Sequence, residues 1–323
     1  MSGPAGAGAA PPGAGGFDSE ALRRWRDDRS SGGTALARGA AALLQKALAH
    51  PPAGALAELA PVLRSLGGAH PAAGAVWRLL DRVARVHDKA RKESASPECA
   101  AERMREAVER YAADLGAAET RVGEAAAALI PDGAVVATYG RSSAVEAALL
   151  EARRRGRRFR VLLSEVRPHQ DGVALAAALG AAGAGCVLTA DATLPMLLAR
   201  ARLVLVGAEA VTPRGLVLRA GSYPLLLAAR ELSLPVHALA PRAAFLDPPP
   251  GTLDLPLDPP EPLLADPPAG VEAINARFEE CPFALVAGVL TEGGYFGATE
   301  AVAAARMGKL HPSLGTEQDR AGS

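Results

Sequence analysis

The chain has 323 residues, long enough for two domains and a sizeable core, and its 35 basic and 35 acidic side chains give a formal net charge of zero. This balance argues against nucleic acid and an anionic membrane surface as partners, and the N-terminus lacks the basic start and apolar core of a signal peptide. The three cysteines lie far apart and the six histidines show no ligand spacing, so we expect a cytoplasmic protein with no disulfide framework, no metal and no other cofactor.

The first part of the chain is predicted to be helical. Residues 1–16 are mostly Gly, Ala and Pro and are expected to form a disordered tail, whereas residues 17–130 show a helical hydrophobic pattern and form the predicted N-terminal domain. Ser96 caps the last helix and Pro97 suits its first position. This helix is long, so it either breaks near Gly116 or forms a spine between two domains. The predicted helices cover residues 17–28, 34–49, 54–66, 71–90 and 97–129.

The next part of the chain is predicted to contain a β-sheet. Between residues 134 and 241, short apolar segments alternate with helix-length segments rich in Ala and Leu. This alternation is typical of a mostly parallel sheet covered by helices, which places the chain in the α/β class. The predicted strands cover residues 134–138, 159–163, 186–189, 203–206 and 235–239.

After Pro241 the alternation stops. Residues 246–270 contain nine prolines, which exclude regular structure and favour an extended segment that wraps the surface. A strand-like apolar run returns at residues 283–290 and is followed by a polar turn. We therefore predict one α/β domain over residues 131–310 and a loose tail over residues 311–323.

Polar loops follow several predicted strands, at the sheet edge where open α/β sheets bind ligands. The first loop is Gly140-Arg141-Ser142-Ser143, at the start of a helix. A glycine, an arginine and two hydroxyls at a helix N-terminus supply what phosphate binding requires: exposed N–H donors, a favourable dipole and a charge-assisted partner. Serines also cap helices that bind no ligand, so this loop alone leaves both interpretations open.

Three further loops carry charge at the same edge. Glu165 and Arg167 follow the second strand, where the alternative to ligand binding is a surface ion pair. Glu209 follows a buried strand and would act as an acid or base if its pKa were shifted. Arg219 lies close to a glycine at a helix start. Convergence of all these loops on one edge would favour a phosphorylated ligand.

One turn in the helical region has a similar character. Gly32 and Gly33 lie directly ahead of a predicted helix, and small residues there would let backbone N–H groups approach an anion. The alternative is an ordinary capped turn between two helices.

Taken in order, these motifs resemble one protein family. They are similar to the alpha, beta and delta subunits of translation initiation factor 2B, whose family also contains isomerases of methylthioribose-1-phosphate and ribose-1,5-bisphosphate. The resemblance covers about residues 17–310 and implies a helical N-terminal domain, then a Rossmann-like domain through which the subunits dimerise. The motifs that carry it, in family-like spacing, are residues 138–143, 164–168, 206–211, 215, 219–222 and 290–293.

The chain departs from those isomerases at their catalytic positions. They use a cysteine after the first strand and an aspartate in a Gly-Ala-Asp turn, and these positions match Gly140 and Glu209. Glycine cannot transfer a proton, and the extra methylene of glutamate moves the carboxylate by more than the ~1 Å misplacement that can cost ~100-fold in rate. Two lysines of the enzymes correspond to Arg219 and Ala244. Cys186 begins or precedes the third strand, away from the site, so it cannot replace the missing thiol.

The resemblance therefore favours a non-catalytic regulatory subunit, either a homodimer or a hetero-oligomer with related subunits, without direct contact to nucleic acid or membrane. It implies a vestigial pocket for a sugar phosphate or a nucleoside monophosphate. In that pocket, Ser142, Ser143 and Arg219 would hold phosphate. The expected ligand-binding residues are Gly32, Gly33, Gly140, Arg141, Ser142, Ser143, Arg167, Glu209 and Arg219.

Two alternatives stay open. An active isomerase that pairs Glu209 with Glu165 or Asp191 for acid–base catalysis would lose its activity on Glu209→Gln. A purely structural assembly subunit with an empty pocket would gain no thermal stability from sugar phosphates or nucleoside monophosphates.

Overall fold

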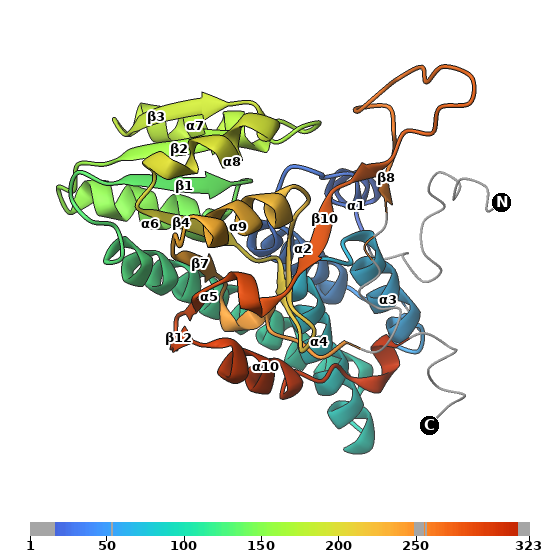
Figure 1. Ribbon diagram of the computed structural model, residues 1–323. Coiled ribbons are helices and arrows are strands. Elements are labelled where there is room, and N and C mark those ends of the chain that lie inside the picture. The colour runs from blue at the N-terminus through green and yellow to red at the C-terminus, as the bar shows by residue number, and fades with distance from the viewer. Residues whose placement is uncertain (1–16, 53, 249–254, 256, 316–323) are drawn as a thin grey trace.

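The computed structural model describes residues 17–52, 54–248, 255 and 257–315, so the predicted tail at residues 1–16 lies outside the described residues. A helical N-terminal region precedes an α/β domain, which confirms the predicted fold class (Figure 1). None of the described helices is both long and apolar enough to cross a membrane. The helices of the first region lie close to the predicted ranges: α1 (Ser19–Arg26), α2 (Gly33–Ala49), α3 (Leu59–Ala69), α4 (Gly74–Lys92) and α5 (Pro97–Ala127).

The long helix α5 is the spine of the molecule. Ser96 caps it as predicted, because its Oγ accepts a hydrogen bond from the Cys99 N–H at 3.3 Å. The helix continues without a break through Gly116. Its first half packs Met104 into the core of the helical region, and its second half packs Val122 against the sheet. The two parts of the chain are therefore joined by one continuous helix.

The α/β domain is built on a seven-stranded sheet in the order β12-β11-β7-β4-β1-β2-β3. All neighbouring strands in it are parallel except β11 and β12. The chain starts at β1, adds β2 and β3 on one side, and then returns to add β4, β7 and β11 on the other. The strands are β1 (Val135–Tyr139), β2 (Arg160–Ser164), β3 (Gly185–Thr189), β4 (Leu203–Gly207), β7 (Val236–Leu239), β11 (Gly288–Thr291) and β12 (Gly294–Phe296).

The inner strands of this sheet are buried on both faces, and successive side chains along each strand point to opposite faces. Val136 and Leu205 pack with α5, α6 and α7 on one face, whereas Ala137 and Val204 pack with α8, α9 and α10 on the other. This double coverage explains why the strands appear in the sequence as nearly continuous apolar runs. The covering helices are α6 (Ser143–Arg154), α7 (Asp171–Ala181), α8 (Leu194–Leu197), α9 (Ser222–Glu231) and α10 (Ala298–Arg306).

Two parts of the α/β domain differ from the prediction. A three-stranded antiparallel sheet, β10-β6-β5, was not predicted; it consists of β5 (Ala210–Val211), β6 (Leu216–Arg219) and β10 (Phe278–Cys281). The predicted strand at residues 283–290 is wrong over its first half. Pro282 starts a 3-10 turn there, in which the Leu285 N–H bonds the Pro282 carbonyl at 3.1 Å, and the strand begins only at Gly288.

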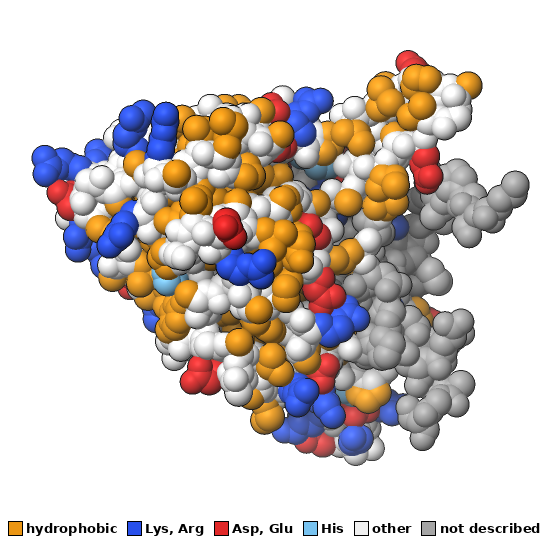
Figure 2. All heavy atoms as spheres, viewed as in Figure 1, with side chains coloured by type: hydrophobic (Ala, Val, Ile, Leu, Met, Phe, Trp, Pro, Cys, Tyr) orange, Lys and Arg blue, Asp and Glu red, His pale blue; other side chains and the backbone are white. Residues whose placement is uncertain are grey.

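Residues 249–254 and 256 of the proline-rich segment lie outside the described residues. The described part differs from its prediction, because residues 259–274 project from the body instead of wrapping it (Figure 1). We call this segment the arm. A short pair of strands, β8 (Leu257–Asp258) and β9 (Asn275–Ala276), forms its base, and Figure 2 shows hydrophobic side chains gathered on it. Prolines lack the N–H that a sheet ladder requires, which disfavours strand pairing along the arm.

The predicted C-terminal tail is packed over its first residues. Leu314 is buried, and an Arg64 Nη1–H donates to the Ser313 carbonyl at 2.7 Å. Residues 316–323 lie outside the described residues.

A buried histidine links the first helices of the chain. His70, at the end of α3, donates from Nε2 to the Trp25 carbonyl at 2.8 Å, and the two rings meet edge to face at 4.5 Å. The Trp25 Nε1–H donates in turn to the Leu36 carbonyl at 2.9 Å. Burial lowers the pKa of His70 to about 4, although the bond to Trp25 opposes this shift. The folded chain therefore holds His70 neutral well below the ordinary histidine pKa.

We predict that this histidine makes stability fall in mild acid. The unfolded chain binds a proton at His70 near its ordinary pKa of ~6.5, whereas the folded chain resists protonation until about pH 4. The stability due to neutral His70 is thus complete above pH ~6.5 and is lost as pH falls toward 4, by about 2 kcal/mol at pH 5. Urea unfolding of wild type and His70→Gln at pH 7 and 5 measures it.

His70→Gln keeps an amide N–H for the Trp25 carbonyl but cannot titrate. Between pH 7 and pH 5 its free energy of unfolding should therefore fall by about 2 kcal/mol less than that of wild type. His50→Gln, at an exposed position, is the control and should behave as wild type. An equal acid loss in wild type and His70→Gln would contradict the assignment.

Candidate functional site

Three of the predicted loops meet at the carboxyl edge of the sheet, beside the point where the strand order reverses between β1 and β4. Gly207, at the end of β4, lies so close to the first loop that a Cβ on it would be 2.1 Å from the Ser142 Cβ. The Tyr139 hydroxyl, at the end of β1, donates to the Ala220 carbonyl at 3.0 Å and so ties in the loop after β6. These contacts bring Ser142, Glu209 and Arg219 to one end of the molecule.

The N-terminus of α2 closes this edge from the helical region. Glu209 Oε2 accepts a hydrogen bond from the Gly33 N–H at 2.6 Å, and the Glu209 carbonyl accepts one from the Gly74 N–H at 2.9 Å. Gly32, the N-cap of α2, has no side chain to cap the helix, so the carboxylate of Glu209 does so. Burial raises the pKa of the Glu209 carboxyl, while Arg219 and the Gly33 N–H oppose the shift. A side chain of the protein therefore lies where an external anion was expected.

Arg219 is buried and is already paired. Its guanidinium forms an ion pair with the buried carboxylate of Asp171, and its Nη2–H donates to the Arg29 carbonyl at 3.4 Å. The guanidinium also lies over the Phe278 ring, 5.0 Å from the ring centroid. Burial raises the pKa of Asp171, and Arg219 opposes this shift. Arg219 thus binds a carboxylate of the chain where a phosphate was expected.

A second buried carboxylate joins three segments next to this pair. Asp258, at the base of the arm, lies 3.5 Å from the Arg29 guanidinium, 3.3 Å from His169 Nε2 and 3.3 Å from the Arg277 guanidinium. Burial lowers the pKa of Arg277 to about 10, and the Asp258 charge opposes the shift. The helical region, the loop after β2 and the arm are therefore held together by buried charge.

Sequence reasoning missed this set of partners. His169 and Asp171 directly follow the second loop, so an extension of that loop past Pro168 would have included them. Asp258 and Arg277 flank the proline-rich segment, which has no periodicity to indicate burial. No local signal in the sequence connects them with Arg29.

The cavity among the converging loops is small. About 20 Å³ remains between Gly33, Ser142, Ser143 and Glu209, which is room for about one water molecule. Ligand sites for drug-sized molecules measure roughly 300–1,000 Å³. The predicted residues that line this cavity are Gly32, Gly33, Ser142, Ser143 and Glu209.

None of the three predicted arginines lines that cavity, and neither does Gly140. Arg141 is exposed and its Nε–H donates to Glu146 Oε2 at 3.1 Å, so it lies instead in an adjoining hollow of about 450 Å³. Arg167 is also exposed. Asp191, which was considered as a catalytic partner, accepts the Val166 and Arg167 N–H groups at 2.8 Å, one on each carboxylate oxygen. It braces the second loop.

No thiol lines the cavity. Cys99 is exposed on α5, Cys186 is half-buried in β3, and Cys281 is buried in β10. Among the described residues, no group of three His, Cys, Asp or Glu side chains is placed to hold a metal ion. The groups available for chemistry in this cavity are the Glu209 carboxylate, the hydroxyls of Thr34, Ser142 and Ser143, and backbone N–H donors.

Comparison with known proteins gives consistent matches. The model of the initiation factor 2 subunit family matches residues 29–297. The chain is 36% identical over 129 residues to a putative translation initiation factor eIF-2B subunit 2-like protein of Pyrococcus furiosus, covering 40% of this chain and 47% of that protein. It is 33% identical over 190 residues to a methylthioribose-1-phosphate isomerase of Gemmatimonas aurantiaca, covering 54% of each. The chain thus spans about half the length of the curated relatives it matches.

The fold is similar to that of one chain in a solved complex. A chain of the tetrameric eIF2B-beta2-delta2 complex from C. thermophilum superposes with a TM-score of 0.67 at 23% identity, over 88% of this chain and 92% of that chain. At this identity the likeness shows the fold alone. The family match, by contrast, extends over most of the sequence and includes all the loops described above. The chain belongs to the initiation factor 2 subunit family.

Proposed function

We propose that this chain is a non-catalytic, oligomeric member of the regulatory-subunit branch of the family, working in the cytoplasm, whose ancestral sugar-phosphate site is filled by its own Glu209. The observation that carries this proposal is the 2.6 Å bond from the Gly33 N–H to Glu209 Oε2, with only about 20 Å³ left beside it. An anion bound at the start of α2 would use the N–H groups there. Glu209 already satisfies one of them.

The remaining donors support a vestigial pocket. Ser142 is the N-cap of α6 but makes no side-chain capping bond, so the first N–H groups of this helix stay available to an anion. Arg219, the expected cation, is held by Asp171. The pocket therefore binds a sugar phosphate or nucleoside monophosphate weakly, and only when the Glu209 carboxylate moves.

The position of the missing thiol supports the loss of catalysis. Gly140 has φ +78°, a conformation that L side chains rarely adopt, and a Cβ there would lie 2.9 Å from Arg219 Cγ. Arg219 thus lies where the side chain of a cysteine at position 140 would begin. The chain has lost the thiol and also the space for it.

Without catalysis, the function that we propose for this chain is assembly with other subunits. The structural neighbour from C. thermophilum is itself a subunit of a tetrameric complex, and the P. furiosus relative is named as a subunit-like protein. A homodimer, or a hetero-oligomer with related subunits, is the proposed state of this chain. Sedimentation of the purified protein tests it.

An isomerase is the second candidate function, favoured by one feature. Burial raises the pKa of Glu209, as a proton-transferring carboxyl requires. Its proposed partner Asp191 already accepts two backbone N–H groups, one on each carboxylate oxygen. Glu165 would have to supply the second proton transfer.

We predict no turnover and weak binding. Methylthioribose-1-phosphate and ribose-1,5-bisphosphate, incubated with the purified protein, should give no ketose signal by NMR. Glu209→Ala should release the Gly33 N–H and enlarge the cavity, so that the sugar phosphates raise the melting temperature more than in wild type. Thermal-shift titration with both compounds measures this.

Glu106→Ala serves as the control, because Glu106 forms only an exposed ion pair with Arg110. Its titration should match that of wild type. Robust turnover that is abolished by Glu209→Gln would establish the isomerase instead. Titrations that leave the melting temperature of both wild type and Glu209→Ala unchanged would support a structural subunit with no ligand.

We also predict that a side chain at position 140 destabilises the folded chain, because it meets Arg219. Gly133 has nearly the same φ, +76°, but a Cβ there has nothing within 4 Å. Gly133→Ala should therefore lower the free energy of unfolding by about 1 kcal/mol, from backbone strain alone. Gly140→Ala should lower it by about 1–3 kcal/mol more, since Arg219 must shift. Urea unfolding gives both values. Equal losses at the two positions would show that Arg219 yields without cost.

A further inference from the structure

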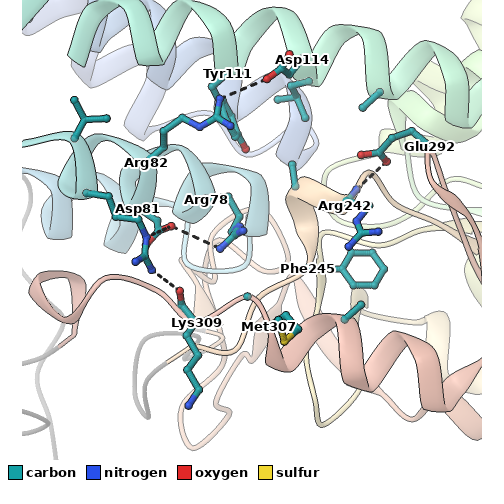
Figure 3. A pocket seen from close by; sticks show the side chains of 17 residues that line it. Arg78, Asp81, Arg82, Tyr111, Asp114, Arg242, Phe245, Glu292, Met307 and Lys309 are labelled. Atoms are coloured by element: carbon teal, nitrogen blue, oxygen red, sulfur yellow. Dashed lines mark hydrogen bonds and ion pairs between the residues drawn. The ribbon is translucent and has the colours of Figure 1, made fainter. Parts of the chain in front are cut away.

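A second hollow lies between the helical region and the α/β domain, apart from the cavity at Glu209 (Figure 3). Its volume is about 850 Å³, within the roughly 300–1,000 Å³ typical of small-molecule sites. Helices α4 and α5 form one wall. The 3-10 turn η3 (Arg242–Ala244), the β11–β12 turn and the end of α10 form the other. We call this hollow the junction groove.

The position of the groove in the fold is that of a ligand site. Arg242 follows the carboxyl end of β7, and Glu292 follows the carboxyl end of β11. Open α/β sheets bind ligands outside these strand ends. The turn η3 separates the two hollows, because Ala244 lines the small cavity whereas Arg242 lines the groove.

The groove carries excess positive charge in a chain that is neutral overall. Cationic side chains outnumber carboxylates in its lining by two. The cations are Arg78, Arg82, Arg85, Arg242 and Lys309, and the carboxylates are Asp81, Asp114 and Glu292.

One part of this charge has a structural role. Asp81 is buried and accepts the Arg85 Nε–H, with both oxygens at 2.9 Å, and the His311 N–H at 2.6 Å. Arg78 lies 3.6 Å from the same carboxylate. This cluster ties α4 to the C-terminal segment. The Asp81 cluster gives no structural role to the other three cations of the groove, Arg82, Arg242 and Lys309.

The other carboxylates do not neutralise those three cations. Arg82 meets Asp114 at 3.5 Å, but the two side chains are 43% and 72% exposed, so the ion pair is weak. Glu292 accepts the backbone N–H of Arg242 at 2.9 Å, and not its guanidinium. Among the described residues, no carboxylate forms an ion pair with the side chain of Arg242 or Lys309.

Aromatic rings hold two of these cations in place. The Arg82 guanidinium lies 5.5 Å from the centroid of the Tyr111 ring, and the Arg242 guanidinium lies 5.5 Å from that of Phe296. Figure 3 shows Arg82 on the α4 wall and Arg242 on the opposite wall. Two pre-positioned guanidinium groups thus face the groove from different domains.

We propose that the junction groove binds a small molecule with two or more linked phosphate groups. A guanidinium presents a planar fork of donors that matches phosphate oxygens, and one phosphoryl group can engage each wall. A ligand bound in this way connects the helical region to the α/β domain. Its site is separate from the cavity at Glu209 and does not depend on the function proposed for that cavity.

The test uses pyrophosphate as the probe, titrated into the full-length protein by calorimetry at low ionic strength. We expect saturable binding with a Kd of about 1 mM or tighter, which weakens as salt is added. Arg242→Gln and Arg82→Gln should each weaken it by roughly tenfold, because each removes a charge-assisted contact. Both positions are exposed, so the melting temperature without ligand should stay unchanged and show that the variants fold.

Arg110→Gln is the matched control. Arg110 is an exposed arginine on α5 that pairs with Glu106 outside the groove, so its loss should leave the affinity unchanged. Excess methylthioribose-1-phosphate should not displace pyrophosphate, which separates this site from the cavity at Glu209. The proposal is overturned if wild type shows no saturable binding, if Arg110→Gln weakens binding as much as Arg242→Gln, or if the sugar phosphate competes.

Discussion

The contact between the Glu209 carboxylate and the start of α2 connects the two halves of this molecule. It satisfies a helix end that has no side-chain cap of its own, and it does so with a residue from the carboxyl edge of the sheet. The same contact removes the donor that an anionic ligand would use. This carboxylate therefore adds a link between the helical region and the sheet, beside α5 and the Asp258 cluster, and it is the same group that the proposed loss of catalysis invokes.

Much of the architecture could be predicted from the sequence, because the relevant signals are local. Helical periodicity located α2 and α5, Ser96 marked a helix start, and buried parallel strands appeared as continuous apolar runs. The convergence of the loops at one sheet edge also followed, since parallel strands share their carboxyl ends. The signal was weakest for β5, β6 and β10, which are two to four residues long and pair antiparallel across distant segments.

The chemistry of the candidate site was harder to predict, because it depends on which charges meet. Arg219 was recognised as a cation, but its neutralisation by Asp171 is a tertiary fact with no spacing rule behind it. Asp258 lies in a segment where proline removes every periodic signal, yet it is buried against two arginines and a histidine. Arg141 was also recognised as a cation, but it is exposed, and Glu146 on the following helix α6 engages it outside the cavity.

The proximity of Gly140 and Arg219 constrains how such a protein can change over generations. A single substitution that introduces a sulfhydryl at position 140 meets both an unfavourable backbone angle and an occupied volume. A smaller residue at 219 would have to come first, and that step leaves the carboxylate of Asp171 buried and alone. Each step toward a thiol at position 140 is thus less stable than the starting point, so the two positions resist this exchange in either order.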